Sequence, residues 1–245
     1  MSGLEQVLAI SGIIFFAGTV KATFGFGEAL IAMPLLAWFL PIEETAPTVA
    51  LVSIVTGSSV LIREWKHVHF RGALQMIIPA AISIPLGVWL LRTTDDSIVK
   101  SLLAVLILGF AVWSLKREHK QALPHDRWAP LAGFLAGILG GAYNTAGPPV
   151  VIYSSLRHWS PEKFRGQLQS FFSFSTFWVV MMHLSQGLIT ENVMKSFLSA
   201  IPGLVLGLIA GHVISKKIPA QRFREVIYYL LIVIGVMLLW NVFLG

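Results

Sequence analysis

The feature that most constrains this chain is a succession of long apolar runs separated by short polar segments. The runs are Leu4–Phe24, Ala29–Leu40, Thr45–Ile62, Gly72–Leu91, Ile98–Leu115, Trp128–Tyr143, Val150–Leu156, Leu168–Leu184, Val193–Ser215 and Val226–Phe243. A helix that crosses a bilayer needs about 20 mostly apolar residues. Three runs in each half approach that length, whereas the short runs are typical of re-entrant segments.

Composition identifies lipid as the solvent of this chain. Of its 245 residues, 56% are hydrophobic and only 12% are charged, whereas about 25% of the residues of a soluble domain are charged. We therefore expect an all-α integral membrane protein in contact with a lipid bilayer.

Several classes of function are disfavoured by what the sequence lacks. There is no cysteine, which excludes disulfides and thiolate metal sites. No zinc-protease, nucleophile-elbow or P-loop motif is present, so we expect no enzyme, no catalytic residue and no metal site. The net charge of +6 resides in short loops, which indicates membrane orientation rather than nucleic-acid binding. The opening "MSGLEQVLAI" lacks the basic start of a signal peptide, and we expect it to belong to the mature protein.

The two halves of the chain follow the same order of elements. Each half contains a glycine-containing break, a short apolar run, a polar loop and three longer apolar runs. Four pairs of identical residues are 120 positions apart: Gly27 and Gly147, Pro41 and Pro161, Ser53 and Ser173, and Gly87 and Gly207. We predict two repeats, at residues 1–120 and 121–245, within one membrane domain, as is common in transporters.

The basic residues predict how the chain is oriented. Of 18 Lys and Arg residues, 14 lie in segments 63–71, 116–127, 157–165 and 216–224, which the positive-inside rule places in the cytoplasm. Residues 128–156 must then leave the cytoplasm and return to it, as a re-entrant hairpin or as two crossings.

The same rule places both Met1 and Glu43 outside, so the first hairpin enters the membrane from the opposite face. Three crossings separate the hairpins, which makes the repeats inverted. We favour six full crossings plus two broken or re-entrant hairpins over ten crossings. Both termini are expected to be extracytoplasmic.

Two breaks, "KATFGFGEAL" and "GGAYNTAGPP", interrupt the apolar pattern. Non-helical backbone at membrane depth is tolerated only where it is buried in protein or lines a wet cavity. Pro148 and Pro149 suit the first turn of a helix, which predicts a helix start near Gly147. Gly25 and Gly27 predict a turn and a helix start near Glu28. Because a helix N-terminus presents free amides and a positive dipole, both starts are attractive to an anion.

The two tips together predict one central binding site. Its expected residues are Lys21, Gly25, Phe26, Gly27 and Glu28 in the first break, Asn144, Thr145, Ala146, Gly147 and Pro148 in the second, and Ser53, Gln169 and Ser173 on the helices that follow. The alternative is that small residues serve only close helix packing. Likewise, Gln169, Ser173 and Thr176 share one helical face, which indicates either a polar path or hydrogen bonds between helices.

Lys21 and Glu28 are the only charges well inside an apolar stretch, and intramembrane charge is a functional hypothesis by default. They form either a structural salt bridge across the turn, or a pair in which Lys21 attracts an anion and Glu28 carries a proton. His183 is expected at the outer interface rather than in a proton relay.

The run "GFLAGILGGAYNTAGPPVVIYSSLRHWSPEKFRGQLQSFFSF" resembles the second-half signature of the TauE/SafE sulfite exporter family, with its glycine-rich break, Pro148 and Pro149, Tyr153, and Phe164 and Arg165. "LSAIPGLVLGLIAGHVISKKIPAQRFREVI" is similar to its C-terminal region. In the first half, "GFGEALIAMP" departs from the family pattern because Glu28 replaces a glycine. The resemblance implies a multi-pass permease of the bacterial inner membrane for sulfite, organosulfonates or related organosulfur and carboxylate anions.

Together these patterns predict a secondary transporter of small anions that works by alternating access, with substrate bound at the midplane between two hairpin tips. The alternatives are an anion channel and a non-transporting membrane assembly subunit. No cofactor is expected; coupling to protons or sodium ions and assembly into a homo-oligomer are left open.

Overall fold

The computed structural model describes residues 3–64, 70–116, 126–157, 159, 161–217 and 220–244, and every element in these ranges is a helix. The helices are α1 (Gly3–Phe24), α2 (Glu28–Leu36), α3 (Ile42–Glu64), α4 (Phe70–Thr93), α5 (Asp96–Lys116), the 3₁₀ turn η2 (Asp126–Trp128), α6 (Ala129–Tyr143), α7 (Gly147–Leu156), α8 (Pro161–Ser185), α9 (Glu191–Lys217) and α10 (Ala220–Leu244). The basic segments that predict orientation lie partly outside the described residues, at 65–69, 117–125 and 218–219.

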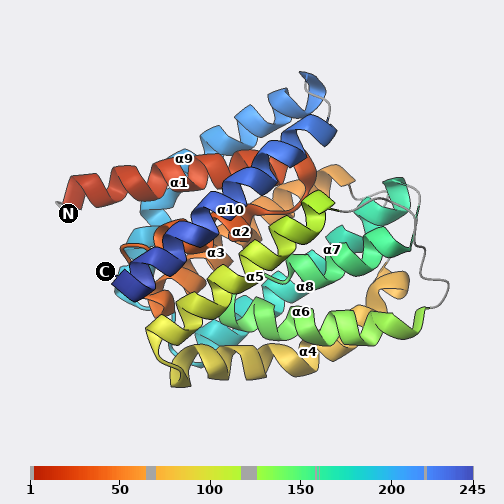
Figure 1. The fold of residues 1–245 in the computed structure, drawn as a ribbon, viewed down its shortest axis with the longest axis horizontal. Coiled ribbons are helices and arrows are strands. Elements are labelled where there is room, and N and C mark those ends of the chain that lie inside the picture. Colours follow the sequence, from red (N-terminus) through yellow and green to blue (C-terminus); the bar gives the residue numbers. More distant parts are fainter. Residues whose placement is uncertain are drawn as a thin grey trace.

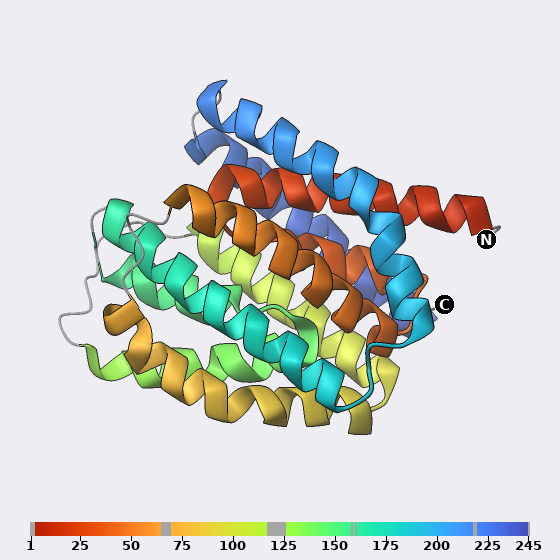
Figure 2. The same ribbon diagram turned by 180° about the vertical axis from the view of Figure 1, so that it is seen from behind.

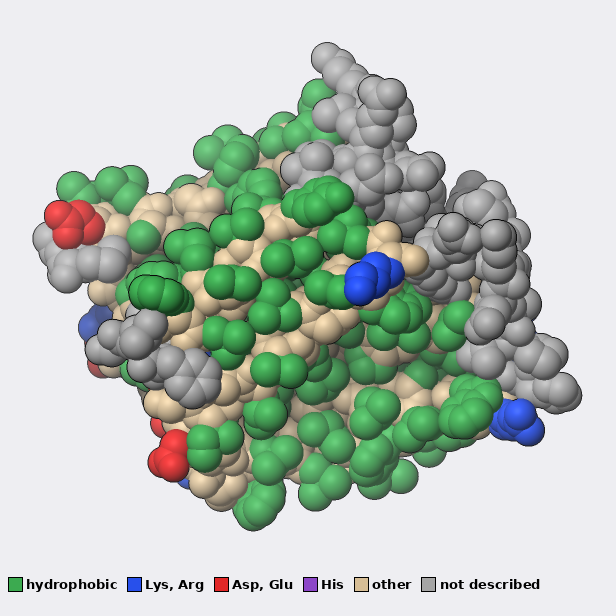
Figure 3. Space-filling model, viewed as in Figure 1, with side chains coloured by type: hydrophobic (Ala, Val, Ile, Leu, Met, Phe, Trp, Pro, Cys, Tyr) green, Lys and Arg blue, Asp and Glu red, His purple; other side chains and the backbone are tan. Residues whose placement is uncertain are grey.

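Five helices are long and apolar enough to cross a membrane within the described residues: Gly3–Phe24, Ile42–Ile62, Ala73–Thr93, Asp96–Lys116 and Glu191–Ser215. Hydrophobic side chains cover most of the face seen in Figure 3, and acidic ones gather at the end that holds the termini. Many large apolar side chains point outward, which water would disfavour and lipid accepts. The expected all-α, multi-pass membrane protein is confirmed.

Helices from the two halves pack against each other in an exchanged pattern. The most extensive pairings are α1 with α9 and α4 with α6, followed by α5 with α10. The first helix of each half therefore contacts the fourth helix of the other half, and the fifth helices contact each other (Figures 1 and 2). This exchange is what two inverted repeats would produce, although the repeat boundary at residue 120 stays a prediction. Both termini lie at the same end of the bundle in both views.

Rows of glycine bring the strongest pairs of helices together. On α9, a Cβ at Gly203, Gly207 or Gly211 would overlap the backbone of α1 or the Ala22 side chain. On α6, a Cβ at Gly133, Gly137 or Gly141 would overlap the backbone of α4 or the Ser83 hydroxyl. Spacing of four residues puts each row on one helix face, as in small-residue membrane helix packing. Each hairpin is thus held by its longer arm, α1 or α6, against the opposite half.

Candidate functional site

The first hairpin turns at residues 25–27, between α1 and α2. Gly25 has φ 83° and Gly27 has φ 96°, a left-handed backbone that glycine adopts without the cost a Cβ imposes. The chain then starts α2 at Glu28, as predicted from the glycines. Two glycines therefore allow the sharp reversal that directs the N-terminus of α2 into the interior.

The second hairpin reverses by different residues. Asn144 follows α6 at φ 50° and ψ 22°, and its backbone N–H donates to the Gly140 carbonyl at 2.8 Å. Asparagine tolerates this left-handed conformation better than most residues. α7 then starts at Gly147, as predicted, with Pro148 and Pro149 in its first turn, where the missing amide hydrogens are not needed.

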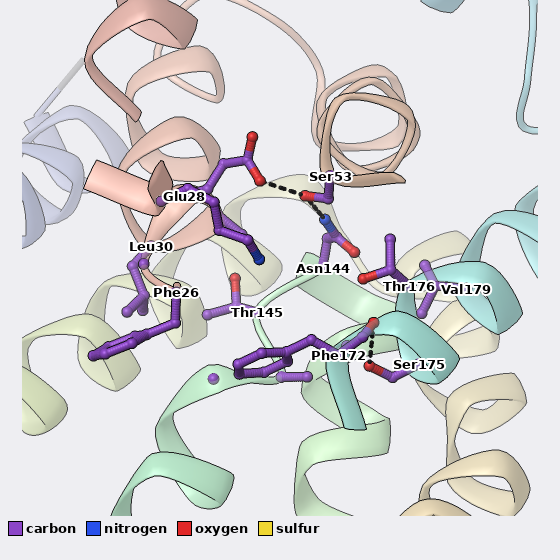
Figure 4. Close-up of a pocket in the computed structure, with 16 residues that line it drawn as sticks. Phe26, Glu28, Leu30, Ser53, Asn144, Thr145, Phe172, Ser175, Thr176 and Val179 are labelled. Atoms are coloured by element: carbon purple, nitrogen blue, oxygen red, sulfur yellow. Dashed lines mark hydrogen bonds between the residues drawn. The ribbon is translucent and has the colours of Figure 1, made fainter. Parts of the chain in front are cut away.

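The two tips meet around one small cavity, drawn in Figure 4. Its lining comes from α1, α3, α6, α8, both tips and the first turns of α2 and α7. About 40 Å³ is open to the centre of a water molecule, so the cavity is large enough to hold water. The lining residues are Lys21, Phe26, Gly27, Glu28, Ala29, Leu30, Ser53, Gly140, Asn144, Thr145, Ala146, Gly147, Phe172, Ser175, Thr176 and Val179.

A chain of hydrogen bonds joins the two halves at this cavity. Asn144 Nδ2 donates to Ser53 Oγ at 2.9 Å, and Ser53 Oγ donates to Glu28 Oε2 at 3.1 Å. Thr56 Oγ1 donates to the same carboxyl oxygen at 2.7 Å. Figure 4 shows the Asn144 and Glu28 side chains on either side of Ser53. The second tip is therefore connected to the first through the α3 hydroxyl of Ser53.

Lys21 supplies a cation to the cavity. Its side chain is only 7% exposed, and its Nζ lies 5.2 Å from the centre of the Phe172 ring. Within the described part of the chain, its ammonium group forms neither a hydrogen bond nor an ion pair, including with Glu28. Of the two alternatives for this pair, the salt bridge across the turn is therefore not formed, because the Glu28 carboxyl is directed toward Ser53 and Thr56 on α3. A buried cation with only an aromatic face beside it attracts an anion.

Two helix N-termini add to this positive potential. Glu28, Ala29 and Leu30 of α2 and Gly147 of α7 line the cavity, and neither helix start is capped by a side-chain hydrogen bond. The first amides of a helix have no intrahelical acceptor. Their N–H groups and the helix dipoles therefore favour negative charge at the point where the tips meet.

Most of the predicted site residues are brought together. Nine of them line the cavity: Lys21, Phe26, Gly27, Glu28, Ser53, Asn144, Thr145, Ala146 and Gly147. Gly25, Pro148, Gln169 and Ser173 do not line it. Gln169 instead donates to the Gly57 carbonyl of α3 at 3.1 Å and to Ser173 at 3.2 Å. Of the two alternatives for Gln169 and Ser173, the structure therefore shows hydrogen bonds within and between helices rather than a polar path.

On α8, sequence reasoning singled out Thr176, which lines the cavity, but it missed the neighbouring lining residues. Phe172, Ser175 and Val179 line it next to Thr176. Their spacing of three and four residues puts them on one helical face. An extension of the helical pattern around Thr176 would have included them. They are mostly apolar or small, however, and such residue types do not by themselves indicate a binding site.

His183 lies near the C-terminal end of α8, and its side chain is buried among the helices of the protein. Its side chain is fully buried, with Nε2 3.4 Å from the Gly141 carbonyl. The ring packs against α6, where glycine leaves the carbonyl accessible.

Among the described residues, no group of three or more His, Cys, Asp or Glu side chains is arranged to hold a metal ion.

Comparison with known proteins identifies the family. The model of the family "Sulfite exporter TauE/SafE" matches residues 10–238, which is nearly the whole chain. The chain belongs to the TauE/SafE family. A "Probable sulfite/organosulfonate exporter TauE" from Cupriavidus necator is 24% identical over 244 residues, covering 96% of this chain and 95% of the relative. No solved structure matches the chain. Membership makes this TauE/SafE protein a membrane transporter rather than an enzyme.

Proposed function

We propose that this protein is a secondary transporter of small sulfur-containing anions, with sulfite and organosulfonates as its foremost substrates. The observation that carries the proposal is the unpaired, buried ammonium group of Lys21 in a cavity flanked by two uncapped helix starts. The name of the Cupriavidus necator relative supports the choice of sulfur anions over other small anions.

The groups around the cavity suit an oxyanion. A sulfite or sulfonate group presents three oxygens, each of which accepts hydrogen bonds. In the proposed complex these oxygens face Lys21, the free amides of Glu28, Ala29 and Gly147, and the amide side chain of Asn144. In this proposal the small cavity accepts such a headgroup, and a longer organosulfonate needs the tips to separate slightly.

Transport is proposed to proceed by alternating access. The pairing of α1 with α9 and of α4 with α6 attaches each hairpin to the other half, so that rocking of one half against the other exposes the site to either side in turn. In this proposal the halves are inverted repeats, the membrane is the bacterial inner membrane and both termini are extracytoplasmic.

The experiment that tests the function is flux in proteoliposomes of purified protein. Radiolabelled sulfite and isethionate should enter protein-containing vesicles in a saturable manner, and unlabelled substrate on the far side should accelerate exchange. A turnover above about 10⁴ per second would exceed what microsecond-to-millisecond conformational cycles allow and would indicate a channel. Absence of flux and binding with every small anion tried would indicate a non-transporting subunit.

A further inference from the structure

One carboxyl group in the cavity wall has a role that anion binding alone does not explain. Glu28 is 2% exposed. Its Oε2 accepts both α3 hydroxyls, whereas its Oε1 is buried and has no hydrogen-bond partner among the described residues. A buried polar oxygen without a partner is costly, and a buried ionised carboxylate without a full set of donors is more costly still. A purely structural acid would be expected to have both oxygens satisfied.

The position of Glu28 also opposes anion binding. Its carboxyl and the Lys21 ammonium line the same cavity, and among the described residues they form no ion pair. When Glu28 is ionised, its negative charge partly cancels the field of Lys21 and repels an anion in the same cavity. When Glu28 is protonated, both effects disappear. The site therefore attracts an anion best when Glu28 carries a proton.

Few other titratable groups are placed to act on this carboxyl. On α1 the group is Lys21. From α3, the second tip and α8 the cavity is lined by hydroxyl, amide and apolar groups. His183 of α8 contacts Gly141 rather than the cavity, and Tyr143 of α6 is buried outside the lining. On the other side of α2, Tyr228 of α10 meets Phe110 edge-on.

We infer that Glu28 carries the coupling ion: one proton binds its carboxyl together with each substrate anion, and the two cross the membrane together. This inference rests on the proposed function. The step forms an O–H bond on Glu28 with a proton from the solvent on one side, and that bond breaks on the other side after the anion has left. No bond to the substrate forms or breaks. A singly charged anion and one proton make the transported pair electrically neutral.

Thermodynamic linkage makes the coupling reciprocal. If protonation of Glu28 strengthens anion binding by a given factor, a bound anion strengthens proton binding by the same factor. The doubly loaded site is therefore favoured over the singly loaded ones, which is the property that a symporter requires. An acid solution on one side of the membrane consequently drives accumulation of the anion on the opposite side.

The test compares the wild type with Glu28→Gln, which keeps the shape and a hydrogen-bond acceptor but cannot take up a proton. Isethionate is the probe because its sulfonate keeps one charge across the pH range. In proteoliposomes, an imposed acid-outside gradient should accumulate isethionate inside with the wild type, with proton uptake of one per anion reported by a trapped pH dye. Glu28→Gln should bind and exchange isethionate without accumulation or proton uptake.

Binding provides a second readout that does not depend on transport. For the wild type, the Kd for isethionate should rise by up to tenfold per pH unit as pH increases through the titration of Glu28, because binding takes up one proton. Glu28→Gln should show a flat profile. The matched control is Glu43→Gln, an acid-to-amide change at an exposed residue outside the cavity, which should behave as the wild type does.

The outcomes separate this inference from the function on which it rests. Wild-type exchange of isethionate without proton uptake, flux that requires sodium instead of a pH gradient, or an unchanged pH profile in Glu28→Gln would each overturn proton coupling and leave anion transport standing. If the wild type moves neither isethionate nor sulfite, anion transport fails and proton coupling fails with it.

Discussion

The two hairpin tips occupy equivalent places in the two halves but reach them with different chemistry. The α1–α2 hairpin turns on left-handed glycines, Gly25 and Gly27, and carries two buried charged residues, Lys21 and Glu28. The α6–α7 tip uses a left-handed Asn144 and two prolines, and it contains no charged residue. The backbone follows the same course in both hairpins: each turn ends the longer helix and begins a short helix whose N-terminus lines the cavity.

The comparison shows that the two tips have a similar backbone arrangement but supply different groups to the cavity. The second tip contributes neutral donors: a helix start that needs no side-chain cap and the Asn144 amide that connects to Ser53. The first tip contributes the charge that attracts a substrate and the acid that is proposed to carry a proton. Changes in the first tip should therefore act on affinity and coupling, and changes in the second on the shape of the site.

The largest effect is expected where the second tip is filled. A Cβ at Gly147 meets no atom within 4 Å, and Gly147 lines the cavity, so Gly147→Leu should fold normally while its side chain occupies the substrate space. Sulfite and isethionate flux should be lost at an unchanged protein level. Gly12→Leu is the matched control because it also meets open space, on the exposed part of α1. Full flux in Gly147→Leu would show that the anion does not pass between the tips.

Removal of the cation from the first tip should come next. Lys21→Met keeps the length and apolar contacts of the side chain but removes the charge that would pair with the bound anion, and the loss of one partner from such a buried pair costs about 2–5 kcal/mol of binding energy. Isethionate affinity should fall on the order of 100-fold or more, as measured by calorimetry in detergent. Lys195→Met, at an exposed surface pair with Glu191, should leave the affinity unchanged. Equal affinities in both variants would remove the distinction between a charged and a neutral tip.

The glycine rows test whether the tips are held equivalently. A Cβ at Gly207 would overlap the Phe15 backbone, and a Cβ at Gly137 would overlap the Ala80 backbone and Ser83. Gly207→Ala and Gly137→Ala should each destabilise the protein by about 1–3 kcal/mol through overpacking, seen as a lower thermal unfolding midpoint in detergent. Gly12→Ala should not lower it. A drop in only one of the two variants would show that the α1–α9 and α4–α6 interfaces differ in role.

The smallest effect is expected at the connection between the tips. Asn144→Gly retains the left-handed backbone but removes the hydrogen bond to Ser53, which is worth about 0.5–1.5 kcal/mol. Isethionate affinity should therefore fall by roughly tenfold or less. Asn144→Leu should be worse because it adds backbone strain of about 1–3 kcal/mol. If Asn144→Gly were as damaging as Asn144→Leu, the amide side chain rather than the turn would be the essential feature of the second tip.

Local signals in the sequence predicted much of the site. Paired prolines and paired glycines mark helix starts regardless of what surrounds them, so the starts of α7 at Gly147 and α2 at Glu28 were predicted correctly. The α8 wall was missed because Phe172 and Val179 look like ordinary lipid-facing or packing residues until a neighbouring helix shows which face is internal. The burial of His183 against α6 was not foreseen for the same reason.

By itself, the sequence determined that this is a helical membrane protein with two interior helix starts. The lengths of the apolar runs indicate membrane helices, and glycine and proline determine turns and helix starts through the backbone of a few neighbouring residues. Only the tertiary structure decided which polar groups meet. Glu28 is directed to Ser53 and Thr56 rather than to Lys21, seven residues before it, since the rotation of α3 presents its hydroxyls to the start of α2. That rotation is set by packing between the two halves, which no local pattern contains, and it leaves Lys21 free to meet an anion.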